Sequence, residues 1–142
     1  MKLSHVLAGA ALAAFLVDAA GADPLPMDTP ITLGTVETAC TGIGEGKDDP
    51  RWASYPIRVE FSNAGSQYLS GAHVKLADAA GKPLAEFDCL GSWVLLRVPR
   101  GIYTVSATVD GQNVPARSAK FEPPASGQKR IVLQFTDIPA NQ

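Results

Sequence analysis

The sequence is poor in the residues on which most enzyme active sites depend. It holds two histidines and two cysteines among 142 residues. One histidine, His5, lies in the apolar N-terminal segment, so His73 is the single histidine of the chain that follows. A Ser-His-Asp or Cys-His site would need that histidine beside an activated nucleophile. We interpret His73 as a solvated side chain on the outward face of a strand, and we predict no catalytic residues and no enzyme activity.

Metal and cofactor signatures are equally scarce. Two cysteines and one histidine do not supply the four ligands of a structural zinc site. The glycine-rich run 42–47 has neither the spacing nor the flanking strand and helix of a nucleotide-binding loop. The acidic residues Glu45, Asp48 and Asp49 lack the alternating spacing of a calcium-binding loop. The sequence therefore predicts no metal and no cofactor.

An excess of charge of one sign is also missing. The 12 Lys and Arg residues face 14 Asp and Glu residues, for a formal net charge of −2. Removal of residues 1–22 takes away only Lys2 and Asp18 and leaves this balance unchanged. Such a balance creates no field that would recruit nucleic acid or an anionic membrane surface. We therefore expect no nucleic-acid partner and no membrane association of the mature chain.

The N-terminal segment has the composition of a secretory signal peptide. Lys2 supplies a positive start, residues 6–17 form an apolar run, and residues 20–22 place small side chains at the cleavage positions. The run is shorter than the roughly 20 apolar residues that a transmembrane helix needs. We predict a signal peptide of residues 1–22, cleaved after Ala22, and a periplasmic or secreted protein. A retained amphipathic anchor is the alternative.

Both cysteines, Cys40 and Cys89, follow the predicted signal peptide, so one intramolecular pairing is possible. An exported chain meets an oxidising compartment, where such a pair usually forms a disulfide. Closing a loop of this length stabilises a fold by roughly 4 kcal/mol in the chain-entropy model. We predict a disulfide between Cys40 and Cys89, with two separately buried thiols as the alternative.

Residues 23–54 are predicted to form an extended N-terminal arm and a glycine-rich loop. The prolines within 23–35 favour extended backbone, and residues 31–33 can lie along a sheet edge. The stretch 36–49 contains several glycines and little apolar periodicity, which predicts a loop. An acidic residue followed by proline and a nearby tryptophan predicts a short helical turn within 48–54.

Residues 55–137 carry the pattern of an all-β domain. Short segments of alternating apolar and polar residues recur between turn signals, without the pattern of a long helix. Segment 93–98 is apolar nearly all round, which is typical of a central strand and places Trp93 in the core, while Pro115 favours a sheet edge. The pattern predicts a seven-stranded antiparallel β-sandwich. The predicted strands are 57–62, 72–77, 84–89, 93–98, 103–109, 112–121 and 129–136.

Few side chains of the predicted domain indicate a functional surface. Glu86 and Asp88 lie two residues apart on one strand face, and we interpret them as solvated rather than as a general acid–base pair. Trp52, Tyr55 and Tyr68 lie near loops, where an aromatic ring can present both an apolar face and a polar group. We predict these three aromatic residues as the possible surface for a ligand or partner.

The runs 68–84, 91–93 and 98–112 resemble a carboxypeptidase regulatory-like domain, which has a transthyretin-like (prealbumin-like) β-sandwich fold. The resemblance extends over residues 55–136, and TGIGE (41–45) also resembles a group of small exported proteobacterial proteins of this kind. The matching residues are Gly71, Ala72, Val74, Leu76, Asp78 and Gly81 in the hairpin, and Val98, Pro99, Gly101, Tyr103, Val105 and Ala107 in the later strand. The resemblance implies a fold without active-site residues, because in carboxypeptidases this domain accompanies a separate catalytic domain.

Three hypotheses of function follow. The first is a non-enzymatic exported module that binds a protein, peptide or glycan of the cell envelope, for example by adding a strand at a sheet edge. The second is an inhibitor or accessory subunit of an envelope hydrolase, which predicts a protruding loop at 41–54. The third is a transthyretin-like hydrolase. That chemistry relies in its family on several histidines and a characteristic C-terminal motif, whereas this chain offers His73 alone and ends in IPANQ.

Overall fold

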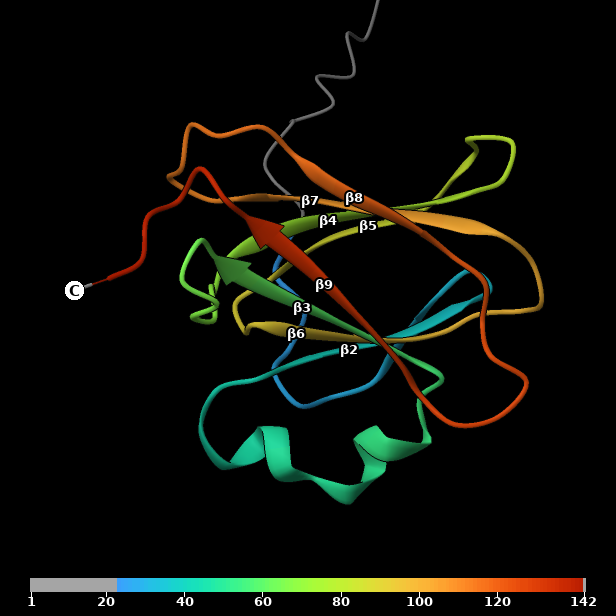
Figure 1. The fold of residues 1–142 in the computed structure, drawn as a ribbon. Coiled ribbons are helices and arrows are strands. Elements are labelled where there is room, and N and C mark those ends of the chain that lie inside the picture. The colour runs from blue at the N-terminus through green and yellow to red at the C-terminus, as the bar shows by residue number, and fades with distance from the viewer. Residues whose placement is uncertain (1–22, 142) are drawn as a thin grey trace, which may run out of the picture.

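The chain folds into two β-sheets packed face to face in a β-sandwich-like arrangement (Figure 1). The computed structural model describes residues 23–141. The predicted signal peptide, 1–22, lies outside the described residues. The strands are β1 (Ile31–Leu33), β2 (Val36–Thr41), β3 (Ile57–Asn63), β4 (Ala72–Asp78), β5 (Pro83–Cys89), β6 (Trp93–Arg97), β7 (Tyr103–Val109), β8 (Arg117–Phe121) and β9 (Lys129–Phe135). The all-β prediction is confirmed, although the described residues form nine strands rather than seven.

The larger sheet has the strand order β1-β2-β6-β3-β9 and is built around β6. This strand pairs antiparallel with β2 on one side and with β3 on the other, and Val94, Leu95 and Leu96 are fully buried. Its position confirms the prediction from its apolar sequence, because a strand covered on both faces has no solvent side. The last strand, β9, pairs parallel with β3. The prediction of a wholly antiparallel sandwich is therefore wrong.

The strand β2 occupies residues for which a loop was predicted. Its side chains at Val36, Thr38 and Cys40 alternate with those of the outer face, and all three are fully buried. Thr38 can be buried among apolar residues because its hydroxyl donates a hydrogen bond of 3.0 Å to the carbonyl of Leu95 on β6. The loop prediction for these residues is wrong. A polar residue at an inward position hides the alternation of apolar and polar residues by which a strand is predicted. The strand β1 pairs with β2 at the sheet edge, as expected for residues 31–33.

The smaller sheet has the order β5-β4-β7-β8. Its first two strands form the predicted hairpin, in which Oδ1 of Asp78 accepts hydrogen bonds from the backbone amides of Ala80 and Lys82. Gly81 in this turn has a φ of 82°, a left-handed conformation that a side chain would disfavour. The strand β8 lies at the sheet edge, as predicted, but it begins at Arg117, after Pro115, rather than at residue 112.

A single large hydrophobic core lies between the two sheets. Phe61 and Phe135 reach it from the larger sheet, and Phe87 reaches it from the smaller sheet. The predicted disulfide is confirmed, and it joins Cys40 of β2 to Cys89 of β5 with a Cα–Cα distance of 5.5 Å. It therefore links one sheet covalently to the other.

The connection between β6 and β7 carries the chain from the larger sheet to the smaller one. The hydroxyl of Tyr103 donates a hydrogen bond of 2.7 Å to the carbonyl of Pro99, and its ring stacks on Phe121 at 5.5 Å between centroids. These contacts fix the geometry of the crossing. They give the tyrosine of this turn a role in joining the crossing to the core.

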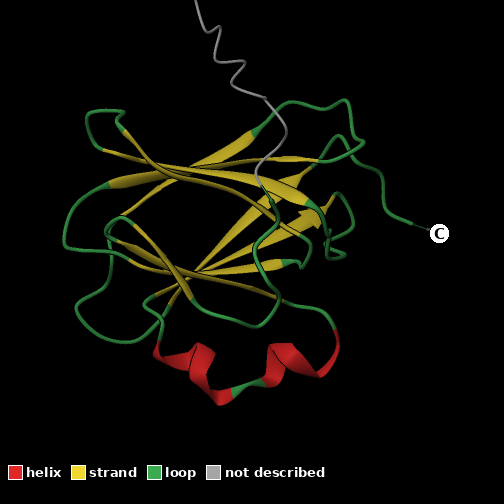
Figure 2. Ribbon diagram, turned by 180° about the vertical axis from the view of Figure 1, so that it is seen from behind, coloured by secondary structure: helices red, strands yellow, loops and turns green. Residues whose placement is uncertain are grey.

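Two 3-10 turns, η1 (Gly44–Asp48) and η2 (Pro50–Ser54), lie on the outer side of the larger sheet (Figure 2). The carboxylate of Asp49 caps η2 by accepting a 2.9 Å hydrogen bond from the backbone amide of Arg51, and proline follows it at the first helical position. The predicted helical turn is confirmed. In the described part of the chain, no helix is long and apolar enough to cross a membrane.

Candidate functional site

The outer face of the larger sheet brings together five side chains that we call the aromatic–arginine face: Arg58, Glu60, Tyr68, Trp93 and Arg130. Strand pairing produces this group. The antiparallel register sets Glu60 opposite Trp93, and the parallel register sets Arg58 beside Arg130. Residues directly opposite each other on one sheet face have their side chains in reach of one another. The face therefore depends on three strands that are distant in sequence.

A tight turn after β3 brings Tyr68 back over the sheet. The side chain of Asn63 organises this turn, because its Oδ1 accepts hydrogen bonds from the backbone amides of Gly65 and Gln67, at 2.9 and 3.0 Å. An isolated β-bridge then pairs Tyr68 with Ser62. Tyr68 is 49% exposed and is the more accessible of the two aromatic residues of this face.

Glu60 is the charged centre of the face and is fully buried. Its carboxylate accepts hydrogen bonds from Nε of Arg58, at 3.0 Å, and from both Nε and Nη2 of Arg130. Burial, the largest single influence, would raise the pKa of Glu60. Hydrogen bonding to Arg130 and Tyr68 and the charges of the two arginines outweigh burial and lower that pKa below its ordinary value. Glu60 is therefore ionised and held between two guanidinium groups.

The aromatic part of the face consists of Tyr68 and Trp93. Their rings meet edge to face, with centroids 6.0 Å apart and an interplanar angle of 78°. The guanidinium of Arg58 lies 4.4 Å from the centre of the Trp93 ring, within the range of a cation–π interaction. Trp93 was expected in the core, but it is half-buried on the outer face because its position alternates with the inward Val94. These contacts hold the two rings in a fixed relative orientation.

A depression of about 210 Å³ lies next to Tyr68. Its lining is mostly polar and consists of Glu60, Ser62, Ser66, Tyr68, Arg130, Val132 and Gln134. The hydroxyl of Ser62, a residue only 4% exposed, has no hydrogen-bond partner among the described residues. A buried polar group without a partner costs free energy unless another molecule satisfies it. The depression is therefore lined in part by a hydroxyl group that no described residue satisfies.

The other two aromatic residues predicted for the surface, Trp52 and Tyr55, are buried instead. Each is 3% exposed, and together they pack on Leu95 in a small cluster outside the main core. Burial is the main cause of the raised pKa of Tyr55, and the nearby charge of Glu37 adds to it. Their rings cover the outer side of the central strand, which would otherwise meet water. The segment 41–54 accordingly packs against the sheet, and the two rings offer no face to a ligand.

His73 lies on the outer face of the smaller sheet between two carboxylates. Its Nδ1 is 2.5 Å from Oδ1 of Asp88, and its Nε2 is 2.7 Å from Oε1 of Glu86. The hydrogen bond to Asp88 is the largest cause of the raised pKa of His73, and Glu86 acts in the same direction against the effect of burial. Because both ring nitrogens are engaged, neither is available to activate a nucleophile. The contact of these three residues was not predicted, because it depends on the pairing of β4 with β5.

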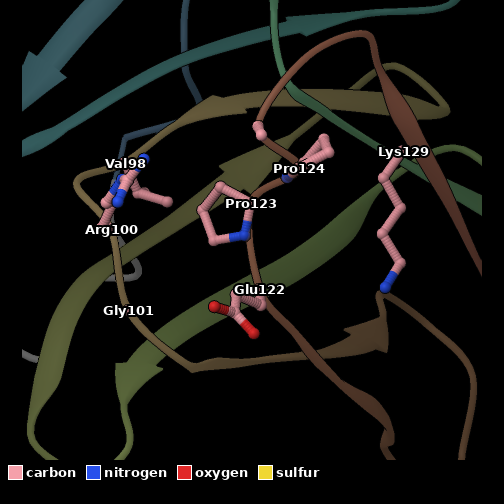
Figure 3. A pocket seen from close by; sticks show the side chains of 8 residues that line it. Val98, Arg100, Gly101, Glu122, Pro123, Pro124 and Lys129 are labelled. Carbon is pink, nitrogen blue, oxygen red and sulfur yellow. The ribbon is translucent and has the colours of Figure 1, made fainter.

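A larger depression, about 690 Å³, lies between the turn after β6 and the loop before β9 (Figure 3). Arg100 and Lys129 lie on opposite sides of it, with Pro123 and Glu122 between them (Figure 3). These three charged side chains are exposed. They form no ion pair with other described residues. The depression offers charged groups but no buried polar side chain that would fix a ligand in one orientation.

Within residues 23–141, no three His, Cys, Asp or Glu side chains are arranged to hold a metal ion. No protein-family model matches the chain. No curated protein is detectably similar to it. The function must therefore be argued from the arrangement of the residues themselves.

Sequence reasoning singled out only Tyr68 among the five residues of the aromatic–arginine face. One local signal was present, because Arg58 and Glu60 carry opposite charges two residues apart on one face of the strand. The third member of the ion cluster, Arg130, is 70 residues from Glu60 in the chain. Only the parallel pairing of β3 with β9 shows that it belongs to the same site.

Proposed function

We propose that the protein is a non-enzymatic exported β-sandwich module that binds a protein, peptide or glycan of the cell envelope through its aromatic–arginine face. The observation that carries this proposal is the exposed ring of Tyr68, held edge to face against Trp93 beside two arginines that share one buried carboxylate. Tyrosine, tryptophan and arginine are the residues most enriched at the energetic centres of binding surfaces.

Preorganisation supports the assignment of this face to binding. The Arg58 guanidinium is held both by Glu60 and by the ring of Trp93, so little side-chain freedom is left to lose when a partner arrives. The neighbouring part of the same sheet face is covered by η1 and η2. The aromatic–arginine face is therefore the uncovered part of this sheet face, and the two turns limit its extent on one side.

Two observations support export and the resemblance to a carboxypeptidase regulatory-like domain. The Cys40–Cys89 disulfide suits an oxidising compartment, in keeping with the signal-peptide composition of residues 1–22. The contact of Tyr103 with Pro99 gives a physical role to the motif that carries the resemblance. The proposed module therefore acts in the periplasm or outside the cell.

The test is an affinity capture from an envelope extract with tagged protein exported from its full-length chain. We expect a partner that the parent protein retains and that the Tyr68→Ala variant loses. Lys120→Ala, an exposed change on the smaller sheet, is the matched control and should retain the partner. Equal capture by the parent protein and Tyr68→Ala, or capture of nothing by either, would contradict the proposal.

A further inference from the structure

We propose that the depression beside Tyr68 binds one carboxylate-bearing sugar unit of an acidic glycan, with the ring of Tyr68 against the sugar ring and Arg130 paired with the sugar carboxylate. This inference rests on the proposed function, since it assigns a ligand class to the same face. Three features carry it: the size of the depression, the polar groups on its wall and the local charge.

The size of the depression fits one ring of a longer chain. Its volume of about 210 Å³ is below the roughly 300–1,000 Å³ that is typical of pockets for whole small-molecule ligands. It is open to solvent on the side of Tyr68, whose ring is half exposed. A single sugar unit can enter while its neighbours in the glycan extend over the sheet. The aliphatic hydrogens of a sugar ring can then pack on the exposed aromatic face.

The wall of the depression is complementary to a ligand that both donates and accepts hydrogen bonds. Ser62 has a buried hydroxyl that can do either and is unpartnered among the described residues. Gln134 uses its amide nitrogen to donate to the carbonyls of Asn63 and Ala64, which leaves its side-chain oxygen as an acceptor. Sugar hydroxyl groups supply donors and acceptors on adjacent carbons. They match this mixed lining.

The local charge favours an acidic sugar over a neutral one. Two guanidinium groups, those of Arg58 and Arg130, share the single carboxylate of Glu60, so the cluster carries one net positive charge. The Arg130 side chain is 55% exposed, donates to Glu60 through Nε and Nη2 and also bonds to the side chain of Tyr68. A planar guanidinium with free N–H groups recognises a carboxylate well. The positive group at the rim would thus select an anionic ligand although the whole chain carries −2.

An acidic peptide fits the same depression less well. A side-chain carboxylate brings acceptors only, so it could accept from Ser62 but would offer no donor to the side-chain oxygen of Gln134. The carboxylate of Glu60 would also repel an acid that entered more deeply. A sugar acid separates the two functions, because its carboxylate can stay at Arg130 while its hydroxyl groups reach the wall.

The experiment measures binding of the exported, signal-processed protein to an immobilised panel of uronic-acid and sialic-acid oligosaccharides, each printed beside its neutral counterpart. A glutamate-rich peptide is included on the same surface. We expect the protein to retain at least one acidic oligosaccharide and to bind its neutral counterpart at least tenfold more weakly. Added salt should weaken the binding, because an exposed charge pair is screened.

Variants separate the two interactions of the ligand. Tyr68→Ala should weaken binding at least tenfold for acidic and neutral sugars alike. Arg130→Gln should remove the preference for the acidic sugar, and Lys120→Ala should change nothing. Denaturation curves of each variant show that it is folded, and Tyr68→Phe, which keeps the ring, provides a second variant that should retain most of the binding.

The outcomes distinguish this inference from the proposed function. Equal binding of acidic and neutral sugars, or no binding to any oligosaccharide of the panel, would overturn the inference. Retention of the peptide instead would overturn it as well. If the envelope capture still depends on Tyr68 in such a case, the proposed function stands and only the ligand class is wrong. If that dependence is also missing, both fail.

Discussion

His73 of β4 and Asp88 of β5 are direct partners across their strands, and Nδ1 of the imidazole lies 2.5 Å from Oδ1 of the carboxylate. Glu86 holds the other ring nitrogen at 2.7 Å. Two carboxylates thus stabilise the protonated form of one histidine on the surface of the smaller sheet. This arrangement makes the stability of the protein depend on pH in a defined direction.

We predict that raising the pH destabilises the protein through His73. Its pKa in the folded state lies above the ordinary value of 6.5, because of the hydrogen bond to Asp88 and the contact with Glu86. A raised folded-state pKa contributes stability that is fully present below pH 6.5 and is lost as the pH rises through the folded-state value. Urea denaturation of the parent protein and of His73→Gln between pH 5.5 and 9 measures the difference. An NMR titration that placed the imidazole pKa at or below 6.5 would contradict the prediction.

We predict that loss of Glu60 destabilises the fold by about 1–3 kcal/mol, because the two arginines that it accepts from would lose their common partner. Glu60→Gln tests this with nearly the same shape. Since the pKa of Glu60 is lowered in the folded state, its contribution is present above the ordinary pKa and is lost as the pH falls through the folded-state value. Glu122→Gln, an exposed change, should stay within roughly 0.5 kcal/mol. Equal stability of the two variants would refute the central role of Glu60.

We predict that the Cys40→Ala/Cys89→Ala double variant is less stable than the parent protein by roughly 2–5 kcal/mol, because the bond between the two sheets no longer restrains the unfolded chain. Chemical denaturation without reductant measures this difference. In the presence of reductant, the parent protein should approach the stability of the variant. Intact mass under non-reducing conditions is the direct check, and two free thiols in the purified protein would show that the bond is not formed.

We predict that Trp52→Ala costs about 3–5 kcal/mol although its ring lies outside the main core, because it is almost fully buried on Leu95. Trp52→Phe should lose less, since it keeps a ring over the strand while giving up the hydrogen bond to the carbonyl of Gly46. Denaturation midpoints measure both effects, and we expect the midpoint of Trp52→Ala to lie below that of Trp52→Phe. An alanine variant as stable as the parent protein would mean that η2 does not stabilise the sheet.

Local sequence patterns were sufficient for much of the fold. The apolar strand β6, the turn at Asp78 and the edge position of β8 each follow from properties of a few neighbouring residues. The disulfide followed from the presence of two cysteines in a chain whose first residues predict an export signal. The strand and the turn depend on short-range patterns, namely the alternation of apolar and polar residues and the residue types that favour turns. The disulfide could be predicted because each cysteine has a single possible cysteine partner in the mature chain.

The candidate site could not be predicted in the same way, because its contacts are between strands distant in sequence. Glu60 reads as an ordinary outward residue until β9 is placed beside β3. Trp52 reads as a surface aromatic until it is known that η2 folds over Leu95. His73 reads as solvated until its register opposite Asp88 is fixed. In each case the neighbouring strand or turn, and not the residue type, decides the environment.

The parallel pair of β3 and β9 also has a consequence for how the chain folds. The strand made last must lie beside a strand completed some 70 residues earlier, so β3 keeps an open edge until the end of the chain is present. Contacts of such long sequence separation are formed late and place a small domain among the slower folders. An incomplete chain would present an unpaired strand edge, which is a template for association with other chains. The strand β9 therefore completes the aromatic–arginine face and, at the same time, covers the open edge of β3.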